Sequence, residues 1–149
     1  MNGTLLVISV VLSIAAALIH VLIFFLESVL WEQPRVWRRF GLHSQGDADI
    51  VRPMAFNQGF YNLFLAAGTG IGLILTGTAT HTGSLPLRAS GLWILLFTLS
   101  FMVLASLVLL STDHRLWRAA LIQGAIPFLA IIVLVVGIVA TARFAGAVP

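Results

Sequence analysis

Four long hydrophobic runs dominate the chain, and short stretches richer in polar residues separate them. The runs cover about residues 5–30, 56–76, 91–110 and 119–142. A helix that crosses a membrane needs about 20 consecutive, mostly apolar residues, and each run reaches that length. No positively charged segment precedes the first run, so we predict an uncleaved helix there rather than a signal peptide. The pattern predicts an all-α integral-membrane four-helix bundle, antiparallel and up-and-down, forming a single domain over residues 1–149.

The three polar stretches predict how the helices are connected. The third, STDHRLWR, is short and typical of a link between antiparallel neighbours. The second, GTATHTGSLPLRAS, is rich in glycine, threonine and serine and predicts a loop. The first covers about residues 31–55 and contains WEQPRVWRRFG, in which Pro34 suits the first position of a helix. Its mixture of aromatic residues and arginines predicts a short interfacial helix on an anionic leaflet, with a lid over a site as the alternative.

The composition agrees with a membrane protein and excludes several kinds of chemistry. Hydrophobic residues make up 60% of the chain and charged residues 9%, whereas soluble domains have about 45–50% and about 25%. The chain has no cysteine, which excludes disulfides, thiolate metal sites and a thiol nucleophile. Its high isoelectric point is not a nucleic-acid signal, because the eight basic residues are all arginines and most lie in short loops.

The arginines predict how the bundle is oriented in the membrane. The first and third loops lie on one side and together carry six arginines, whereas the opposite side carries two. Short cytoplasmic loops are enriched in arginine and lysine. We therefore expect the first and third loops in the cytoplasm and both termini outside the cytoplasmic (inner) membrane. The six arginines are Arg35, Arg38, Arg39, Arg52, Arg115 and Arg118, and the two are Arg88 and Arg143.

Polar residues inside the hydrophobic runs gather in the half of the membrane nearest the six arginines. His20 and Glu27 lie seven residues apart in the first run, so they face the same way and differ in height by about 10 Å. Gln123 lies in the first turns of the fourth run, one turn before Pro127. The other half of the runs is almost purely aliphatic residues and glycine. The glycines at 68 and 72 in the second run predict a close helix contact.

The second run opens with a block of polar side chains, AFNQGFYN. Asn57 and Tyr61 share one helical face, and Gln58 and Asn62 share another, because each pair is four residues apart. These amides lie at the level where Glu27 and Gln123 can meet them. The sequence therefore predicts a polar pocket between the helices that opens toward the cytoplasm.

Each of these polar residues also has a plainer interpretation. The amides can cap a helix, contact headgroups or join helices by hydrogen bonds. Tyr61 can belong to an interfacial aromatic belt, and Glu27 can pair with a loop arginine such as Arg35, Arg38 or Arg39. His20 can be a neutral buried histidine or handle a proton. A metal site at His20 and Glu27 is disfavoured, because their heights differ too much for them to share one ion easily.

The residues resemble a family of small bacterial four-helix membrane proteins known as domain of unknown function thirteen-zero-four. The resemblance rests on His20, the Leu-Glu pair at 26–27 with Trp31, and the Phe-Gly pair at 40–41. It continues in NQGFYN with Phe-Leu-Ala at 57–66 and in QGAIP at 123–127, so it spans most of the chain. It implies the same four-helix fold and a site formed by these positions, but it implies no activity.

Three functions are compatible with the sequence. The first, weakly favoured, is an enzyme that performs acid–base chemistry, an isomerisation or a hydrolytic ring opening, on a small apolar or amphipathic ligand without a cofactor. The second is a proton-coupled transporter, possibly a homodimer. The third is an accessory subunit without chemistry of its own. The expected partners are the lipid bilayer and the ligand, and not nucleic acid. The candidate catalytic residues are Glu27, His20 and Tyr61, and the candidate substrate-binding residues are Asn57, Gln58, Asn62, Gln123 and Trp31.

Overall fold

A computed structural model describes residues 3–146, and in that range helices joined by short turns form the fold, with no strand. Four segments are long and apolar enough to cross a membrane: Gly3–Val29, Gln45–Thr82, Leu85–Thr112 and His114–Ala142. This confirms the predicted helical membrane bundle. The elements are α1 (Gly3–Phe24), the π-helical turn η1 (Phe25–Val29), α2 (Pro34–Trp37), the 3₁₀ turn η2 (Arg38–Phe40), α3 (Gln45–Thr82), α4 (Leu85–Thr112), the 3₁₀ turn η3 (His114–Leu116) and α5 (Trp117–Gly146).

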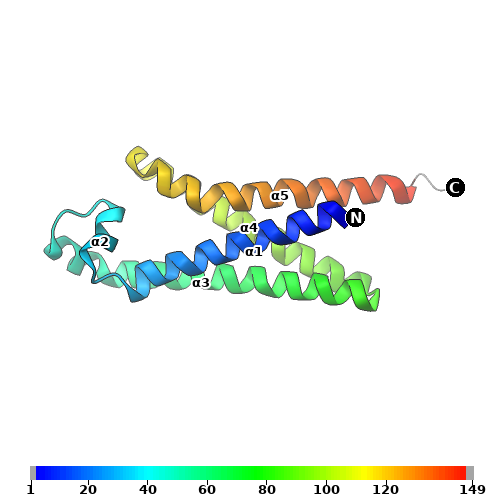
Figure 1. Ribbon diagram of the computed structural model, residues 1–149, viewed down its shortest axis with the longest axis horizontal. Coiled ribbons are helices and arrows are strands. Elements are labelled where there is room, and N and C mark those ends of the chain that lie inside the picture. The colour runs from blue at the N-terminus through cyan, green and yellow to red at the C-terminus, as the bar shows by residue number, and fades with distance from the viewer. Residues whose placement is uncertain (1–2, 147–149) are drawn as a thin grey trace.

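The four long helices pack in a ring whose order follows the chain. α1 packs against α3, α3 against α4, α4 against α5, and α5 closes the ring against α1. Figure 1 shows both described ends of the chain at one end of the bundle, with α2 and the turn between α4 and α5 at the other. We call this second end the arginine-rich end, because the six arginines of the first and third loops lie there.

The outward faces of the helices are apolar, and the inward face of α3 is formed by small or polar residues. Large side chains such as Val7, Leu18, Ile74 and Phe97 are more than 60% exposed on the outside of the bundle. A soluble protein would not leave so many contiguous apolar side chains in water, so a bilayer is their natural surroundings. The side chains that α3 buries between Ala55 and Ala79 are instead small or polar: Ala55, Gly59, Asn62, Ala66, Thr69, Gly72, Thr76 and Ala79.

Small residues allow the backbones of α3 and α4 to approach closely. A Cβ atom added to Gly91 would lie 2.9 Å from the carbonyl oxygen of Gly72 and 2.7 Å from the amide nitrogen of Thr76. A Cβ atom on Gly68 would lie 2.7 Å from Cγ2 of Thr98. The close contact predicted for the glycines at 68 and 72 is therefore confirmed, and Gly91 of α4 completes it.

The half of the bundle far from the arginine-rich end is more polar inside than the sequence suggested. Buried hydroxyls line it at Ser9, Ser13, Thr69, Thr76 and Thr98. Each is satisfied within its own helix; for example, Oγ of Ser13 donates to the carbonyl oxygen of Ser9 at 2.8 Å. Oγ1 of Thr69 shares its one hydrogen between the carbonyl oxygen of Leu65, at 2.9 Å, and Oγ1 of Thr98, at 3.0 Å, and the second contact joins α3 to α4. Because carbonyl oxygens of their own helices accept their hydrogens, we interpret these hydroxyls as small packing residues between helices and not as binding groups.

The second connection is a tight turn rather than the predicted loop. α3 continues through the threonine-rich segment to Thr82, and α4 begins at Leu85. Gly83 ends α3 in the left-handed conformation, with φ of 70°, which glycine adopts without steric cost. Ser84 then caps α4, since its side chain accepts a hydrogen bond from the amide of Leu87 at 3.4 Å. The cap residues, rather than the polarity of the segment, decide where these helices end.

The first connection contains the predicted short helix, folded against α3. Pro34 occupies the first turn of α2, as expected. The apolar side chains Trp31, Val36 and Trp37 are buried in a cluster with Ala48 of α3, so α3 rather than lipid covers them. α3 begins at Gln45, well before the predicted boundary near residue 56, because Ser44 caps it by accepting from the amide of Asp47 at 3.1 Å.

Candidate functional site

A cavity of about 500 Å³ opens between the helices at the arginine-rich end. α1, α3, α4 and α5 all contribute to its wall, and η2 contributes to its rim. The volume lies within the range of roughly 300–1,000 Å³ that is usual for small-molecule sites. The cavity is lined by Ile19, Leu22, Ile23, Leu26, Glu27, Arg39, Phe40, Gln58, Asn62, Ala105, Leu109, Leu116, Arg118, Ala119, Ile122 and Gln123.

The chemistry of this lining changes along the bundle axis. Arg39 of η2 and Arg118, the second residue of α5, lie at the end of the cavity nearest the loops. Gln123 is five residues further along α5, which places it about 7.5 Å deeper. Ile19 and Ile23 of α1 line the innermost part. The cavity thus has a cationic mouth, a polar middle and an apolar floor.

Glu27 is the only carboxylate in the lining, and Asn62 holds it in place. Its side chain is buried, with 8% exposed. Nδ2 of Asn62 donates to Oε2 of Glu27 at 3.1 Å and also to the carbonyl oxygen of Gln58 at 3.0 Å. The second bond anchors the amide to its own helix, so Asn62 presents its other N–H to the carboxylate in a fixed direction.

A close approach of α1 and α3 makes this contact possible. A Cβ atom on Gly59 would meet Oγ of Ser28 and would lie 3.2 Å from both Cβ of Glu27 and the carbonyl oxygen of Phe24. The hydroxyl of Ser28 donates to the carbonyl oxygen of Phe56 at 2.9 Å, which ties the two helices together beside Gly59. Glycine at this position is therefore required for Glu27 and Asn62 to meet.

Glu27 sits at the centre of a π-helical turn. The amide of Leu30 donates to the carbonyl oxygen of Phe25 at 2.8 Å, a bond that spans five residues instead of four. Single π turns inside α-helices occur frequently at functional sites. Here the wider turn lets Glu27 face the cavity while its neighbour Ser28 contacts α3.

Several polar side chains in the cavity have no partner among the described residues. The side-chain amides of Gln58 and Gln123 make no hydrogen bond, and the guanidinium of Arg39 makes neither a hydrogen bond nor an ion pair. Arg39 and Gln58 are exposed and Gln123 is half-buried, so their unpaired polar groups remain accessible from the cavity to a ligand or water.

His20 is buried close to the cavity but does not line it. Nδ1 of His20 lies 2.9 Å from the carbonyl oxygen of Ala16 and therefore acts as the donor. Nε2 is fully buried and has no partner in the described part of the chain. The structure thus places His20 on the buried face shared with Glu27, deeper in the bundle, with one ring nitrogen unused.

Three other candidate residues lie outside the cavity. Tyr61 is 55% exposed on the outer surface, and Asn57 on the same face of α3 is exposed too. Trp31 is buried in the loop cluster, where Nε1 donates to the carbonyl oxygen of Ala48 at 2.9 Å. The structure therefore does not bring these three residues to the cavity: Trp31 holds the first loop on α3, and the outward face of α3 carries Tyr61 and Asn57 away from Glu27.

Sequence reasoning missed Arg39, Phe40 and Arg118 as parts of the cavity wall. The number of arginines in these loops already has an explanation in membrane topology, so it does not indicate a second role at a site. For Arg39 and Phe40 the sequence offered one indication, the alternative interpretation of the first loop as a lid over a site. The alternative interpretation, in which Glu27 pairs with a loop arginine, is not found; among the described side chains, the ion pair is between Arg52 and Glu32, 2.6 Å apart on the surface.

The cavity is distinct from the other hollows of comparable size, and the described residues offer no ready metal site. A hollow on α4 is lined by residues such as Trp93 and Phe101 and contains no charged group. A second, between α1 and α3, has only apolar and glycine lining. No group of three or more His, Cys, Asp or Glu side chains within the described residues is placed to hold a metal ion.

Comparison with known protein families gives one result. Residues 14–135 match the family described as Protein of unknown function (DUF1304). The chain belongs to this family. No curated protein and no solved structure matches the chain. Every residue that lines the cavity falls inside the range matched by the DUF1304 family, so the cavity is built entirely from the family domain.

Proposed function

We propose that the protein is an integral-membrane enzyme that performs acid–base chemistry, without a cofactor, on a small apolar or amphipathic substrate. One observation carries the proposal: a single buried carboxylate, Glu27, faces a ligand-sized cavity and is oriented by Asn62. Candidate general bases must lie within hydrogen-bond reach of the proton they move, and a carboxylate fixed in the wall of a ligand-sized cavity meets that condition for a bound substrate.

An isomerisation uses the cavity's groups without any further reagent. Glu27 removes a proton from a carbon next to a substrate carbonyl, and the electron pair moves toward the carbonyl oxygen. The free amide N–H groups of Gln58 or Gln123 stabilise that oxygen by hydrogen bonds. The protonated carboxyl exchanges its proton with water and then protonates a different carbon, so a double bond moves, a hydrogen from water enters the product and nothing is oxidised or reduced.

A hydrolytic ring opening uses the same groups with one water molecule. Glu27 takes a proton from the water as its oxygen attacks a ring carbon. The ring carbon–oxygen bond breaks, and the leaving oxygen takes up a proton, so that one water is added in total. The two reactions differ in the atom of water that becomes bonded to carbon: a hydrogen in the isomerisation and an oxygen in the ring opening. An isotope experiment separates them.

The placement of the polar groups favours an enzyme over the two other functions. An accessory subunit that grips a partner helix would turn its amides outward, but Asn62, Gln58 and Gln123 face their own cavity. A transporter needs a route to the far side, and the core beyond the cavity is closed by Leu99, Met102 and other buried side chains. The unpartnered Nε2 of His20 is the observation that favours proton coupling.

The experiment follows water-derived atoms into an unidentified product. The purified protein in lipid nanodiscs is incubated with a panel of carbonyl-containing and cyclic-ether amphiphiles in D₂O or H₂¹⁸O, and products are analysed by mass spectrometry. We expect deuterium in the carbon skeleton for an isomerisation, or ¹⁸O for a ring opening. Glu27→Gln should lower incorporation by about 100-fold or more, the scale of a lost general base.

Glu32→Gln is the matched control, because it makes the same substitution at an exposed carboxylate outside the cavity. It should retain the incorporation of the unaltered protein. Equal incorporation by the unaltered protein and Glu27→Gln would contradict the assignment of Glu27.

A further inference from the structure

The mouth of the cavity carries two arginines whose charges the protein leaves uncompensated. Neither Arg39 nor Arg118 forms an ion pair with a described residue, although Arg52 at the same end does. Arg118 is held with its guanidinium carbon 5.3 Å from the centre of the Trp117 ring. Arginine presents its N–H groups in a planar fork that matches carboxylate and phosphate oxygens, so the mouth is suited to an anionic group.

The cavity also opens sideways toward the bilayer. Leu22 of α1 and Ile122 of α5 line the cavity, and their side chains are 56% and 62% exposed. This high exposure of two lining residues indicates an opening between the helices that carry them. Figure 1 shows α1 and α5 diverging toward the arginine-rich end, where the blue and orange helices separate. A molecule dissolved in the bilayer can therefore reach Glu27 without crossing water.

The order of groups in the cavity matches the order of groups in an ionic lipid. The cationic mouth is nearest the loops, the amides, Glu27 and the side opening at Ile122 follow, and the apolar floor is deepest. A molecule with an anionic head, a polar junction and an apolar chain meets a complementary surface at each level. A cationic amphiphile would place its head against two arginines, and a neutral one would leave both without a partner.

We propose that the ligand is an anionic amphiphile that binds from the bilayer, its carboxylate or phosphate head held by Arg39 and Arg118 and its chain passing between Leu22 and Ile122. This rests on the proposed function in its choice of cavity, and it adds the class of ligand and the route by which it arrives.

The first test measures which head group the cavity selects. Binding of four single-chain ligands with the same sixteen-carbon chain is compared in phosphatidylcholine nanodiscs: palmitate, palmitoyl lysophosphatidate, hexadecanol and hexadecyl trimethylammonium. We expect at least one anionic ligand to bind about tenfold or more tightly than hexadecanol, because charge-assisted hydrogen bonds to arginine are strong. Preference for palmitate identifies a carboxylate site, and preference for lysophosphatidate identifies a phosphate site.

Matched variants connect that preference to the two arginines. Arg39→Gln with Arg118→Gln should remove the preference for the anionic head. Arg35→Gln with Arg115→Gln removes the same charge from exposed positions at the same end and should keep it. Equal affinity for hexadecanol, tighter binding of the cationic ligand, or loss of preference in the control pair would overturn the proposal.

The second test closes the side opening. The chain has no cysteine, so Leu22→Cys with Ile122→Cys can be bridged selectively by a reducible bifunctional thiol reagent. Bridging should slow ligand association several-fold, and reduction should restore it. Val11→Cys with Val136→Cys gives a control pair on the outer faces of the same helices, away from the cavity. Unchanged association in the bridged protein would exclude the lateral route.

Comparing ligand binding with isotope incorporation separates this proposal from the proposed function. If anionic ligands bind selectively but no isotope is incorporated, the ligand class stands and the enzymatic function fails. If isotope enters substrates without regard to head-group charge, the enzymatic function stands and the ligand class is wrong.

Discussion

At the scale of single residues, the position of Glu27 depends on the glycine that faces it. Gly59 of α3 lies against the π turn so closely that a Cβ atom would meet Ser28 and would be 3.2 Å from the carbonyl oxygen of Phe24. That oxygen belongs to the backbone and cannot rotate away. Any side chain at 59 must therefore push α1 and α3 apart at the point where Asn62 reaches the carboxylate.

We predict that Gly59→Ala destabilises the folded protein and disconnects Glu27 from Asn62. Overpacking of this kind costs about 1–3 kcal/mol, which reversible unfolding in mixed detergent micelles can measure. Gly70→Ala is the control, because a Cβ atom on Gly70 has nothing within 4 Å. It should be neutral or slightly stabilising, since alanine favours a helix more than glycine does. Similar losses in both variants would show that glycine matters for another reason.

Only part of the candidate site could be predicted from individual residues. The cost of polar groups in a membrane drew attention to Glu27, Gln58, Asn62 and Gln123, and the structure brings these four to one cavity. The same argument cannot decide which face of α3 points inward when both faces are polar, so it also selected Tyr61. Nor could it detect arginines that reach the cavity from the loops.

At the scale of elements, α3 and α4 are the helix pair whose glycines come closest to backbone atoms of the partner helix. Gly72 and Gly91 face each other, and a Cβ atom on Gly91 would lie 2.9 Å from the Gly72 carbonyl oxygen. Lipid tails are as apolar as the helices, so the hydrophobic effect does not drive membrane helices together. Their association depends instead on van der Waals packing, which a close backbone contact strengthens.

We predict that Gly91→Ala separates α3 from α4 and lowers stability by about 1–3 kcal/mol. Gly77→Ala places the same methyl group on α3 in open space and should be tolerated. Spin labels on the two helices would report the separation in bilayers, and unfolding in micelles would report the stability. An unchanged label distance in Gly91→Ala would contradict the assigned contact.

The existence of the four helices was predictable, but their ends were not. Hydropathy marks the part of a helix that contacts lipid, whereas caps mark where the helix stops. α3 has 38 residues, about 57 Å at 1.5 Å per residue, against a hydrocarbon core of about 30 Å. Its excess length lies in polar sequence at both ends, where Ser44 and Gly83 set the limits. The π turn of η1 likewise leaves no signal in a hydropathy pattern.

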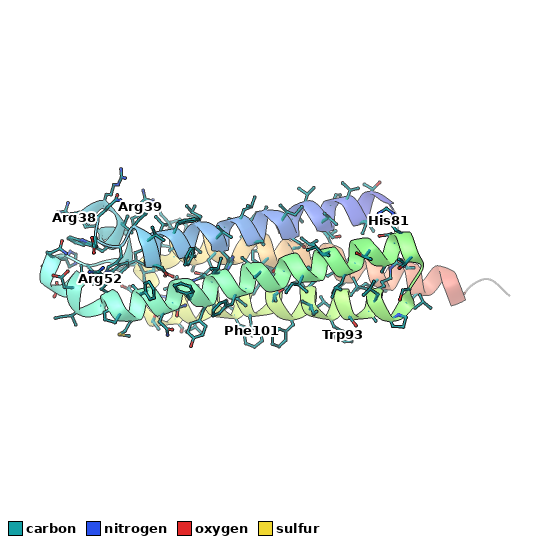
Figure 2. The ribbon with its side chains drawn as sticks, turned by 90° about the horizontal axis from the view of Figure 1, so that it is seen from below. Arg38, Arg39, Arg52, His81, Trp93 and Phe101 are labelled. Carbon is teal, nitrogen blue, oxygen red and sulfur yellow. The ribbon has the colours of Figure 1, made fainter. Side chains whose placement is uncertain are left out.

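At the scale of the whole molecule, the two ends of the bundle differ in charge. Figure 2 shows Arg38, Arg39 and Arg52 at one end and His81 at the other. The six arginines of the first and third loops favour placing that end in the cytoplasm. The cavity would then open to the cytoplasmic leaflet, whose anionic lipids belong to the ligand class that Arg39 and Arg118 select.

We predict that the arginine-rich end faces the cytoplasm, and two exposed histidines provide a matched test. His114 lies in η3 at the arginine-rich end, and His81 lies in the last turn of α3 at the opposite end. Because the chain has no cysteine, His81→Cys and His114→Cys each carry a single thiol. A membrane-impermeant maleimide applied to intact spheroplasts should label His81→Cys at once and His114→Cys only after permeabilisation. The reverse pattern would place the cavity in the outer leaflet, where Glu27 would meet lipids and solutes from outside the cell. Labelling of both thiols without permeabilisation would indicate a mixture of orientations, which a six-to-two division of arginines should prevent.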